Sequence, residues 1–166
     1  MKLYFDLDGV IRDLARAVGI MPEKWNGENH VLLHGKSIVQ FLDEHRFLLR
    51  YAPPTRYYKI IRTLPKVYII TAQPRYEWEI FAEAWIHDYF EEGQVEIEHV
   101  ACGEDKLFFL SDDAVLFEDS PKLSNYEKIY LIDYPYNRCV DKCLGRITNE
   151  VDLFLTIQKI SGGKVK

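Results

Sequence analysis

The chain has 166 residues, of which 48% are hydrophobic and 28% are charged. This composition is typical of one globular domain with a sizeable core, and it excludes disordered, collagen-like and coiled-coil chains. With 26 acidic and 21 basic residues the formal charge is −5. We therefore expect no extended nucleic acid as a partner, whereas a small phosphorylated ligand is compatible with this balance.

Five short apolar runs, rich in β-branched and aromatic residues, predict buried strands. They cover residues 2–5, 67–71, 95–100, 114–117 and 129–132. Helical patterns separate several of these runs, and strands that alternate with helices are typical of βαβ units. The sequence therefore predicts an α/β fold, with a Rossmann-like parallel sheet of about five strands and helices on both faces.

Three segments carry the spacing of amphipathic helices. The longest has an apolar stripe made of Trp78, Phe81, Ala82, Trp85, Ile86, Tyr89 and Phe90. A second stripe covers residues 57–64, and we expect Thr55 to be the N-cap of that helix. A last helix is predicted to begin after Asn149, its N-cap, and to end at the two glycines 162–163.

The stretch between the first two strands is too long for one crossover. It ends at two prolines and contains an extra helical stripe made of Ile38, Phe41, Leu42 and His45. We predict a small helical cap at residues 14–52, inserted into a core of residues 1–13 and 53–166. The cap would lie over the C-terminal end of the first strand, where open α/β sheets bind their ligands.

The first strand is followed by Asp6-Leu7-Asp8-Gly9, which places two carboxylates at the exit from the sheet. Side chains two residues apart on a strand face the same way, so Asp6 and Asp8 can address one ligand, and Gly9 permits the tight turn. Such a pair suits a nucleophile or metal ligand beside a general acid/base. The alternative is a turn aspartate followed by a helix cap, which is common for a lone Asp-x-Asp.

Two further candidates lie beside later strands. Thr71 ends the second apolar run, and its hydroxyl, with the next backbone N–H of Ala72, could hold a phosphoryl oxygen. An ordinary helix N-cap is the alternative for Thr71. Lys106 follows the third run and could neutralise a phosphoryl dianion, although the common fate of a single lysine is a solvated surface position.

Glu118 and Asp119 follow the fourth run directly. Hard oxygen ligands at two strand ends would make a site for Mg²⁺, which keeps several waters and bridges to substrate phosphate. A strand-terminal turn with a capping aspartate is the alternative. Each of these signals is ambiguous alone. Their joint order at one edge of the sheet, Asp-x-Asp then Thr then Lys then an acidic pair, is more specific.

These four segments resemble the four motifs of the haloacid dehalogenase (HAD) superfamily, over residues 2–122. A narrower similarity to the 5′(3′)-deoxyribonucleotidase branch lies in Thr71-Ala72-Gln73-Pro74, which runs into Trp85-Ile86, and in the segment 131–138. That branch carries a helical cap between its first two motifs, where this chain has its predicted insertion. Ala72 stands where the better-known vertebrate members have a serine, so their substrate selectivity does not carry over directly.

The resemblance implies a Mg²⁺-dependent phosphomonoesterase that forms an aspartyl-phosphate and dephosphorylates (deoxy)nucleoside monophosphates. Asp6 would attack phosphorus, and Asp8 would protonate the leaving alkoxide and then activate water. Mg²⁺ would lie between the Asp6 carboxylate, the Asp8 backbone carbonyl and Asp119, with Glu118 nearby. The transferring oxygens would be held by Thr71, Ala72 and Lys106.

Substrate choice is expected to lie in the cap, where the sequence is less informative. Trp25 either stacks on a nucleobase, which is worth roughly 1–3 kcal/mol, or belongs to the core of the cap. Arg138 either contacts a phosphate or closes the sheet edge.

The alternative functions are a phosphatase for another small ester such as a sugar phosphate, a mutase, and a non-catalytic phosphate-binding domain. The acidic balance disfavours an enzyme that processes nucleic-acid ends.

Three cysteines, Cys102, Cys139 and Cys143, form an odd set with no secretory signal ahead of them. We expect reduced thiols in a cytoplasmic protein. Every uncharged run is far too short to span a membrane, so we expect no membrane partner. A homodimer is compatible with the sequence.

Overall fold

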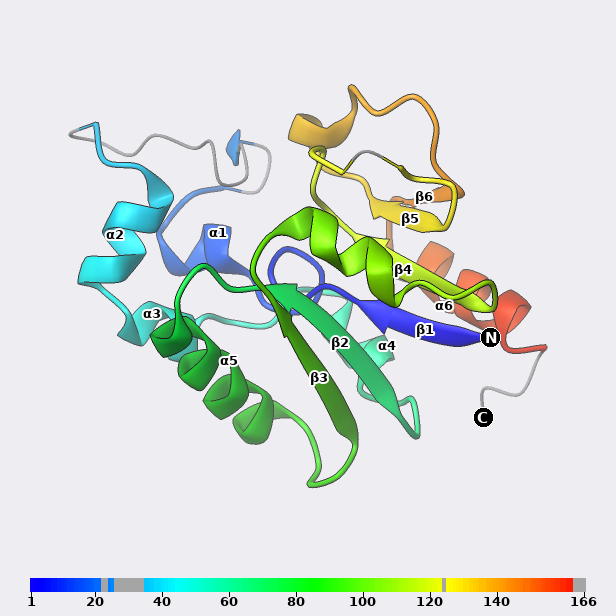
Figure 1. The fold of residues 1–166 in the computed structure, drawn as a ribbon, viewed down its shortest axis with the longest axis horizontal. Helices are drawn as coiled ribbons and strands as arrows, with labels where there is room; N and C mark the ends of the chain where they lie inside the picture. The colour runs from blue at the N-terminus through cyan, green and yellow to red at the C-terminus, as the bar shows by residue number, and fades with distance from the viewer. Residues whose placement is uncertain (22–23, 26–34, 124, 163–166) are drawn as a thin grey trace.

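The computed structural model describes residues 1–21, 24–25, 35–123 and 125–162. These residues form one parallel sheet of six strands, in the order β3-β2-β1-β4-β5-β6 (Figure 1). The strands are β1 (Lys2–Phe5), β2 (Val67–Ala72), β3 (Val95–Val100), β4 (Ala114–Glu118), β5 (Ile129–Ile132) and β6 (Gly145–Ile147). The predicted α/β class and parallel sheet are confirmed.

Among the described residues, the sheet has one strand more than the five that the sequence predicts. β6 has three residues and pairs in parallel with β5. Such a short segment, with Ile147 as its one buried side chain, carries no period-2 signal. The position of β6 depends on close packing against β5. A Cβ atom at Gly145 would lie 2.9 Å from the ring of Tyr130 on β5, so a larger residue would not fit there. Glycine therefore lets the two strands approach closely.

β1 and β4 lie side by side in the middle of the sheet, although they are far apart in the sequence. All five residues of β4 are buried, as is typical of a strand inside a parallel sheet. The rings of Phe5 and Phe117, which face each other across the two strands, stack with centroids 4.9 Å apart. The chain continues from β1 to β2 on one side and from β4 to β5 on the other. The strand order therefore reverses at β1 and β4, and open α/β sheets bind ligands at such a point.

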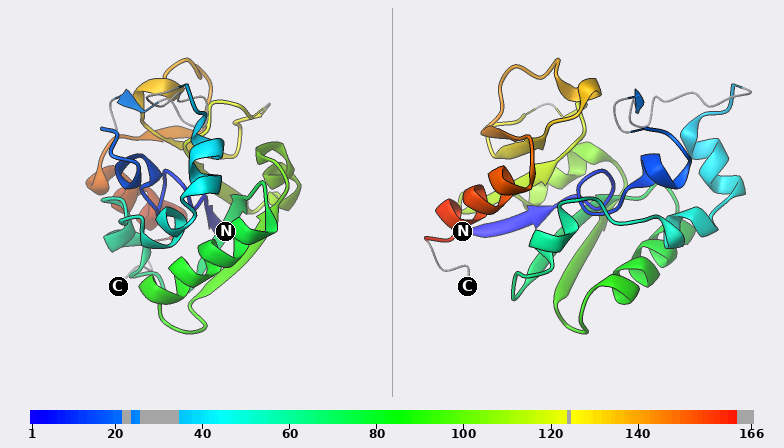
Figure 2. Two further views of the ribbon diagram at one scale, coloured as in Figure 1. Left: turned by 90° about the vertical axis from the view of Figure 1, so that its left-hand side faces the viewer. Right: turned by 180° about the vertical axis from the view of Figure 1, so that it is seen from behind.

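The two faces of the sheet are covered differently. Three α-helices share the core on one face (Figure 2): α4 (Tyr58–Ile61), α5 (Tyr76–Tyr89) and α6 (Glu150–Ile160). The other face is covered by the 3₁₀ helix η3 (Gly103–Phe109) and by loops, around side chains such as Leu116 and Leu131. The expected helices on both faces are therefore α-helices on one face and a 3₁₀ helix on the other.

The predicted helix boundaries are partly confirmed. Asn149 is the N-cap of α6, and its side chain accepts a backbone N–H at 3.0 Å. α6 ends before Gly162, which has a φ of +63°, whereas Gly163 lies outside the described residues. The prediction that Thr55 is the N-cap of α4 is wrong. Tyr57 is the N-cap of α4; the Thr55 hydroxyl accepts from the Tyr57 N–H at 3.2 Å and donates to the Val10 carbonyl at 2.6 Å.

The described part of the predicted cap forms three short helices ahead of α4, namely α1 (Leu14–Ala17), α2 (Ile38–Glu44) and α3 (Phe47–Tyr51). They share a buried cluster that includes Trp78 from α5, and they lie beyond the end of the sheet at which β1 ends (Figures 1 and 2). A capping box of Ser37 and Gln40 starts α2. Positions 22–23 and 26–34 of the predicted cap lie outside the described residues. The division into core and cap stays a prediction.

Candidate functional site

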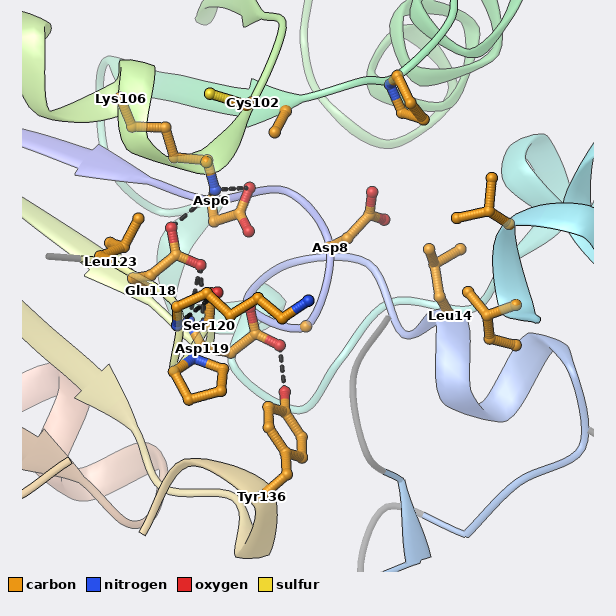
Figure 3. A pocket seen from close by; sticks show the side chains of 18 of the residues that line it. Asp6, Asp8, Leu14, Cys102, Lys106, Glu118, Asp119, Ser120, Leu123 and Tyr136 are labelled. Carbon is orange, nitrogen blue, oxygen red and sulfur yellow. Dashed lines mark hydrogen bonds and ion pairs between the residues drawn. The ribbon is translucent and has the colours of Figure 1, made fainter. Parts of the chain in front are cut away.

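A cavity of about 490 Å³ lies at the carboxyl end of the sheet, and its two walls differ in chemistry. The core wall carries charged side chains (Figure 3): Asp6, Asp8, Lys106, Glu118 and Asp119. The opposite wall, made by the helices that follow β1 and by the start of α5, is mainly apolar: Leu14, Trp25, Ile38, Val39, Leu42 and Trp78. Small-molecule sites commonly combine such an apolar lining with a few convergent polar groups.

Asp6 is the first residue after β1, and the sheet itself holds it in place. Its backbone N–H donates to the Phe117 carbonyl at 2.9 Å, which continues the β1–β4 ladder by one residue. The side chain is 9% exposed, and its Oδ1 accepts from the Leu7 N–H at 2.8 Å. The Lys106 Nζ lies 2.9 Å from the same oxygen. Both contacts use Oδ1, and none of the described residues forms a hydrogen bond or ion pair with Oδ2, so Oδ2 is the oxygen that Asp6 can offer to a ligand.

Glu118 closes β4 with a buried carboxylate that organises the following turn. Its Oε1 accepts from the backbone N–H groups of Asp119 at 3.0 Å and Ser120 at 3.1 Å. Its Oε2 accepts from the Lys106 Nζ at 2.7 Å. The Lys106 charge and these hydrogen bonds outweigh burial and lower the pKa of Glu118 below its usual range. Glu118 is therefore an ionised anchor within the site.

Lys106 is the positive centre of the core wall. It is 3% exposed and lies between the carboxylates of Asp6 and Glu118. Burial by itself would lower the pKa of this lysine, but the two neighbouring carboxylates outweigh burial and raise its pKa. The alternative of a solvated surface lysine is therefore excluded.

Asp119 follows Glu118 and is held by segments far away in sequence. The Tyr136 hydroxyl donates to its Oδ2, and the Asn137 side-chain amide donates to its carbonyl at 2.9 Å. Gly9 faces it from the turn after β1. Gly9 has a φ of +84°, and a Cβ atom there would overlap the Asp119 Oδ2. Any larger residue would push this carboxylate out of place.

Asp6, Glu118 and Asp119 form an acidic cluster in which ligand atoms of all three residues lie within 4.8 Å of one another. Burial raises the pKa of Asp6 well above its usual range, and the nearby Glu118 charge adds to this effect. The same two causes raise the pKa of Asp119. A bound cation would relieve both costs, because it stabilises the ionised forms. The cluster could therefore hold a metal ion, and its oxygen donors suit a hard cation.

Asp8 lines the same cavity, but among the described residues its side chain is not one of that acidic cluster (Figure 3). Its carboxylate instead accepts hydrogen bonds from Arg12, which the sequence analysis missed, and from Gln73, to which it assigned no role. An arginine directly after the apolar pair Val10-Ile11, and four residues after Asp8, was the signal that could have pointed to Arg12. The expected metal contact of the Asp8 carbonyl stays a prediction.

The candidate phosphate-binding pair of β2 is divided between the cavity and the core. Ala72 lines the cavity, whereas Thr71 is 1% exposed and does not appear among the described lining residues. The Thr71 hydroxyl accepts from the Gln73 side-chain amide at 2.7 Å. Thr71 therefore reaches the site through Gln73, and direct contact of Thr71 with a phosphoryl group stays a prediction.

The two candidate substrate residues differ in position. Trp25 lines the cavity and also packs, partly buried, against the cluster of the inserted helices, so both predicted roles remain compatible with its place. Arg138 is not among the described lining residues. Its side chain is 63% exposed and forms an ion pair with Asp133 at 3.0 Å. A phosphate contact of Arg138 stays a prediction.

The loop after β5 carries Arg138, a predicted substrate residue, but the sequence analysis assigned no role to the tyrosines of this loop. Besides the contact of Tyr136 with Asp119, the Tyr134 hydroxyl donates to the Gly9 carbonyl at 2.9 Å. This loop therefore ties the turn after β1 to the turn after β4. A Tyr-Pro-Tyr segment directly after a buried strand was the available signal.

None of the described helices is both long and apolar enough to cross a membrane. The three cysteines are free, as expected of reduced thiols. The cytoplasmic location, the small phosphorylated partner and the homodimer stay predictions. Comparisons of the chain with protein-family models, with curated proteins and with solved structures found no match. What the geometry establishes is a parallel α/β fold with a buried acidic cluster that could hold a metal ion.

Proposed function

We propose that the protein is a Mg²⁺-dependent phosphomonoesterase that acts on (deoxy)nucleoside monophosphates through an aspartyl-phosphate. One observation carries the proposal: the buried Asp6 keeps one oxygen for a ligand, beside a charged lysine and a second pair of carboxylates. This constellation lies where the strand order reverses between β1 and β4. It supplies a nucleophile, a cation for phosphoryl oxygens and oxygen ligands for a metal in one place.

The acidic cluster fits a divalent cation. Asp6 and Asp119 would hold Mg²⁺, with Glu118 beside them, because hard carboxylate oxygens are the ligands that Mg²⁺ prefers. When bound, the ion supplies charge neutralisation, since an anionic carboxylate must approach an anionic phosphate. Two unit charges about 4 Å apart would otherwise repel by ~4 kcal/mol at an effective dielectric constant of 20.

The residues of the chain would divide the reaction into two steps. In the first step Oδ2 of Asp6 forms a bond to phosphorus, the bond to the ester oxygen breaks, and Asp8 gives its proton to the leaving oxygen. In the second step Asp8 takes a proton from water while the water oxygen attacks phosphorus. The bond from phosphorus to Asp6 then breaks, which releases phosphate and regenerates both carboxyl groups.

Lys106 supports the phosphoryl group in this proposal. Its Nζ lies 2.9 Å from Oδ1 of Asp6, so a phosphoryl group on Oδ2 would lie next to a fixed positive charge. The Ala72 N–H and the Thr71 hydroxyl are the proposed further donors, at the end of β2 on the same edge of the sheet.

The apolar wall supports a substrate with a flat, weakly polar part, such as a nucleobase. Trp25 and Trp78 belong to this wall, together with the aliphatic side chains Ile38 and Leu42. Aromatic residues stack on bases without regard to base identity. The volume of about 490 Å³ lies within the range of small-molecule sites.

The proposal is tested by phosphate release from nucleoside and deoxynucleoside monophosphates beside sugar phosphates, with Mg²⁺ and with EDTA. We expect metal-dependent release that favours deoxynucleotides. Phosphate release at similar rates from all small esters would support the phosphomonoesterase activity but contradict a nucleotide as the preferred substrate. No release from any ester by a folded sample with Mg²⁺ would contradict the proposed activity.

A further inference from the structure

Arg12 is a completely buried cation beside the cavity, and no step of the proposed reaction uses it. Its exposed fraction is 0%, and it follows Asp8 by four residues on the turn after β1. An unpaired guanidinium in such a position would be strongly destabilising, so its partners explain why it is there.

Asp8 is the partner of this guanidinium through both carboxylate oxygens. Nε of Arg12 donates to Oδ1 at 2.6 Å and Nη2 donates to Oδ2 at 2.8 Å. Such a bidentate pair fixes the plane of a carboxylate as well as its position. Nη1 donates to the Leu49 carbonyl on α3 at 2.7 Å. One guanidinium therefore joins Asp8 to the inserted helices.

Gln73 holds the same carboxylate from another side. Its Nε2 lies 3.3 Å from Oδ2 of Asp8 and 2.7 Å from the Thr71 hydroxyl. Its Oε1 is buried and has no hydrogen-bond partner among the described residues. Asp8 nevertheless keeps 24% of its side chain exposed and lines the cavity. The carboxylate is therefore fixed in orientation but open to a ligand.

We propose that Arg12 is a positioning residue for Asp8, holding its carboxylate at the cavity wall where it can reach the leaving oxygen of a bound ester. The inference rests on the proposed function, in which Asp8 transfers that proton. Figure 3 shows Asp8 apart from Asp6, Glu118 and Asp119 and extending into the space between the two walls. Without Arg12 the side chain would rotate about χ1 and lose this position.

The test compares Arg12→Met and Arg12→Lys with the wild-type protein on two esters. The p-nitrophenyl ester has a leaving group that departs without a proton, whereas an alkyl ester needs one. The alkyl ester used is whichever alkyl phosphate of the substrate panel the wild-type protein hydrolyses fastest. The rate of alcohol release is measured in the first turnover, so that hydrolysis of the aspartyl-phosphate does not enter.

For Arg12→Met we expect alcohol release from the alkyl ester to slow roughly 100-fold, because misplacing a catalytic group has an effect of this size. The KM for the alkyl ester should be nearly unchanged. Release of p-nitrophenol is expected to change less than about threefold, because that step needs no proton from Asp8. Arg12→Lys keeps the charge but loses the bidentate fork, so we expect a loss of roughly 10-fold confined to the alkyl ester. It also serves as the test if Arg12→Met does not fold.

A double-mutant cycle separates positioning from a general structural effect. Once Asp8→Asn has removed the proton donor, we expect Arg12→Met to cause no further loss on the alkyl ester. Equal losses on both esters, or additive losses in the double variant, would overturn the role of Arg12 while leaving the proposed function intact. A wild-type protein that releases alcohol from neither ester would overturn both.

Discussion

The two walls of the cavity are built in different ways. On the core wall, charged groups are held by partners from different elements, as Lys106 on η3 is held between Asp6 and Glu118 at the ends of β1 and β4. On the opposite wall, side chains such as Leu14 and Leu42 pack into a small cluster of their own. The sheet therefore fixes the candidate reacting groups, whereas the apolar wall can be altered without disturbing the sheet.

The largest effect is expected on the core wall, from Asp6→Asn. The amide is a poor nucleophile, so we expect phosphate release to fall by at least ~10³-fold. The fold should stay intact, because Asn removes a buried carboxylate whose pKa is raised by burial and by the Glu118 charge. Phosphate release and thermal unfolding of the same samples check both parts.

A matched control for Asp6→Asn is Asp112→Asn, which makes the same chemical change on a fully exposed side chain far from the cavity lining. It should leave both turnover and unfolding unchanged. Wild-type rates in Asp6→Asn would contradict its role as the nucleophile.

The strand ends could be predicted from the sequence because each motif directly follows a buried apolar run. Asp6 and Glu118 are the residues that follow or end β1 and β4, so a correct strand assignment already places them at one edge. Arg12 and Tyr136 could not be placed in this way. Their contacts depend on how a turn and a loop fold back over the sheet, and β6 escaped detection because it has three residues. Tertiary contacts, rather than local pattern, decide these features.

The next effect is expected from Gly9→Ala, which alters the contact between the turn after β1 and Asp119 after β4. The positive φ costs about 1–2 kcal/mol for a non-glycine residue. Crowding of the Cβ atom against the Asp119 carboxylate adds about 1–3 kcal/mol. We expect a loss of both unfolding free energy and Mg²⁺ affinity, measured by urea denaturation and calorimetric titration.

Gly93→Ala is the control for the Gly9 variant. Gly93 has a φ of +75°, but a Cβ atom there meets nothing within 4 Å. The unfolding free energy of this variant should fall only by the cost of the positive φ, and its Mg²⁺ affinity should be unchanged. Equal losses in the two variants would show that the approach of Gly9 to Asp119 has no energetic consequence.

On the apolar wall a smaller and more selective effect is expected from Trp25→Ala. Loss of a stacking surface is worth roughly 1–3 kcal/mol, so KM for nucleotides should rise about 10-fold while kcat changes little. KM for sugar phosphates should stay constant, and Trp25→Phe should restore most of the nucleotide affinity. An equal rise in KM for both classes would assign Trp25 to the core of the inserted helices instead.

The last effect needs no substitution: it is a pH dependence of stability that arises from the buried carboxylates of the core wall. Burial and the Glu118 charge raise the pKa of Asp6 and Asp119 above their unfolded value of 3.8, so the folded protein binds more protons than the unfolded chain above that pH. The unfolding free energy should therefore fall as pH rises from about 5, by up to ~1.4 kcal/mol per pH unit for each proton retained. Glu118 has a lowered pKa and so affects the unfolding free energy in the opposite sense, but only below its ordinary pKa of 4.5.

Mg²⁺ should flatten the decline of the unfolding free energy with pH, because it favours the ionised carboxylates. Urea denaturation between pH 5 and about 8, with Mg²⁺ and with EDTA, measures both slopes, and identical slopes would contradict a cation site at this cluster.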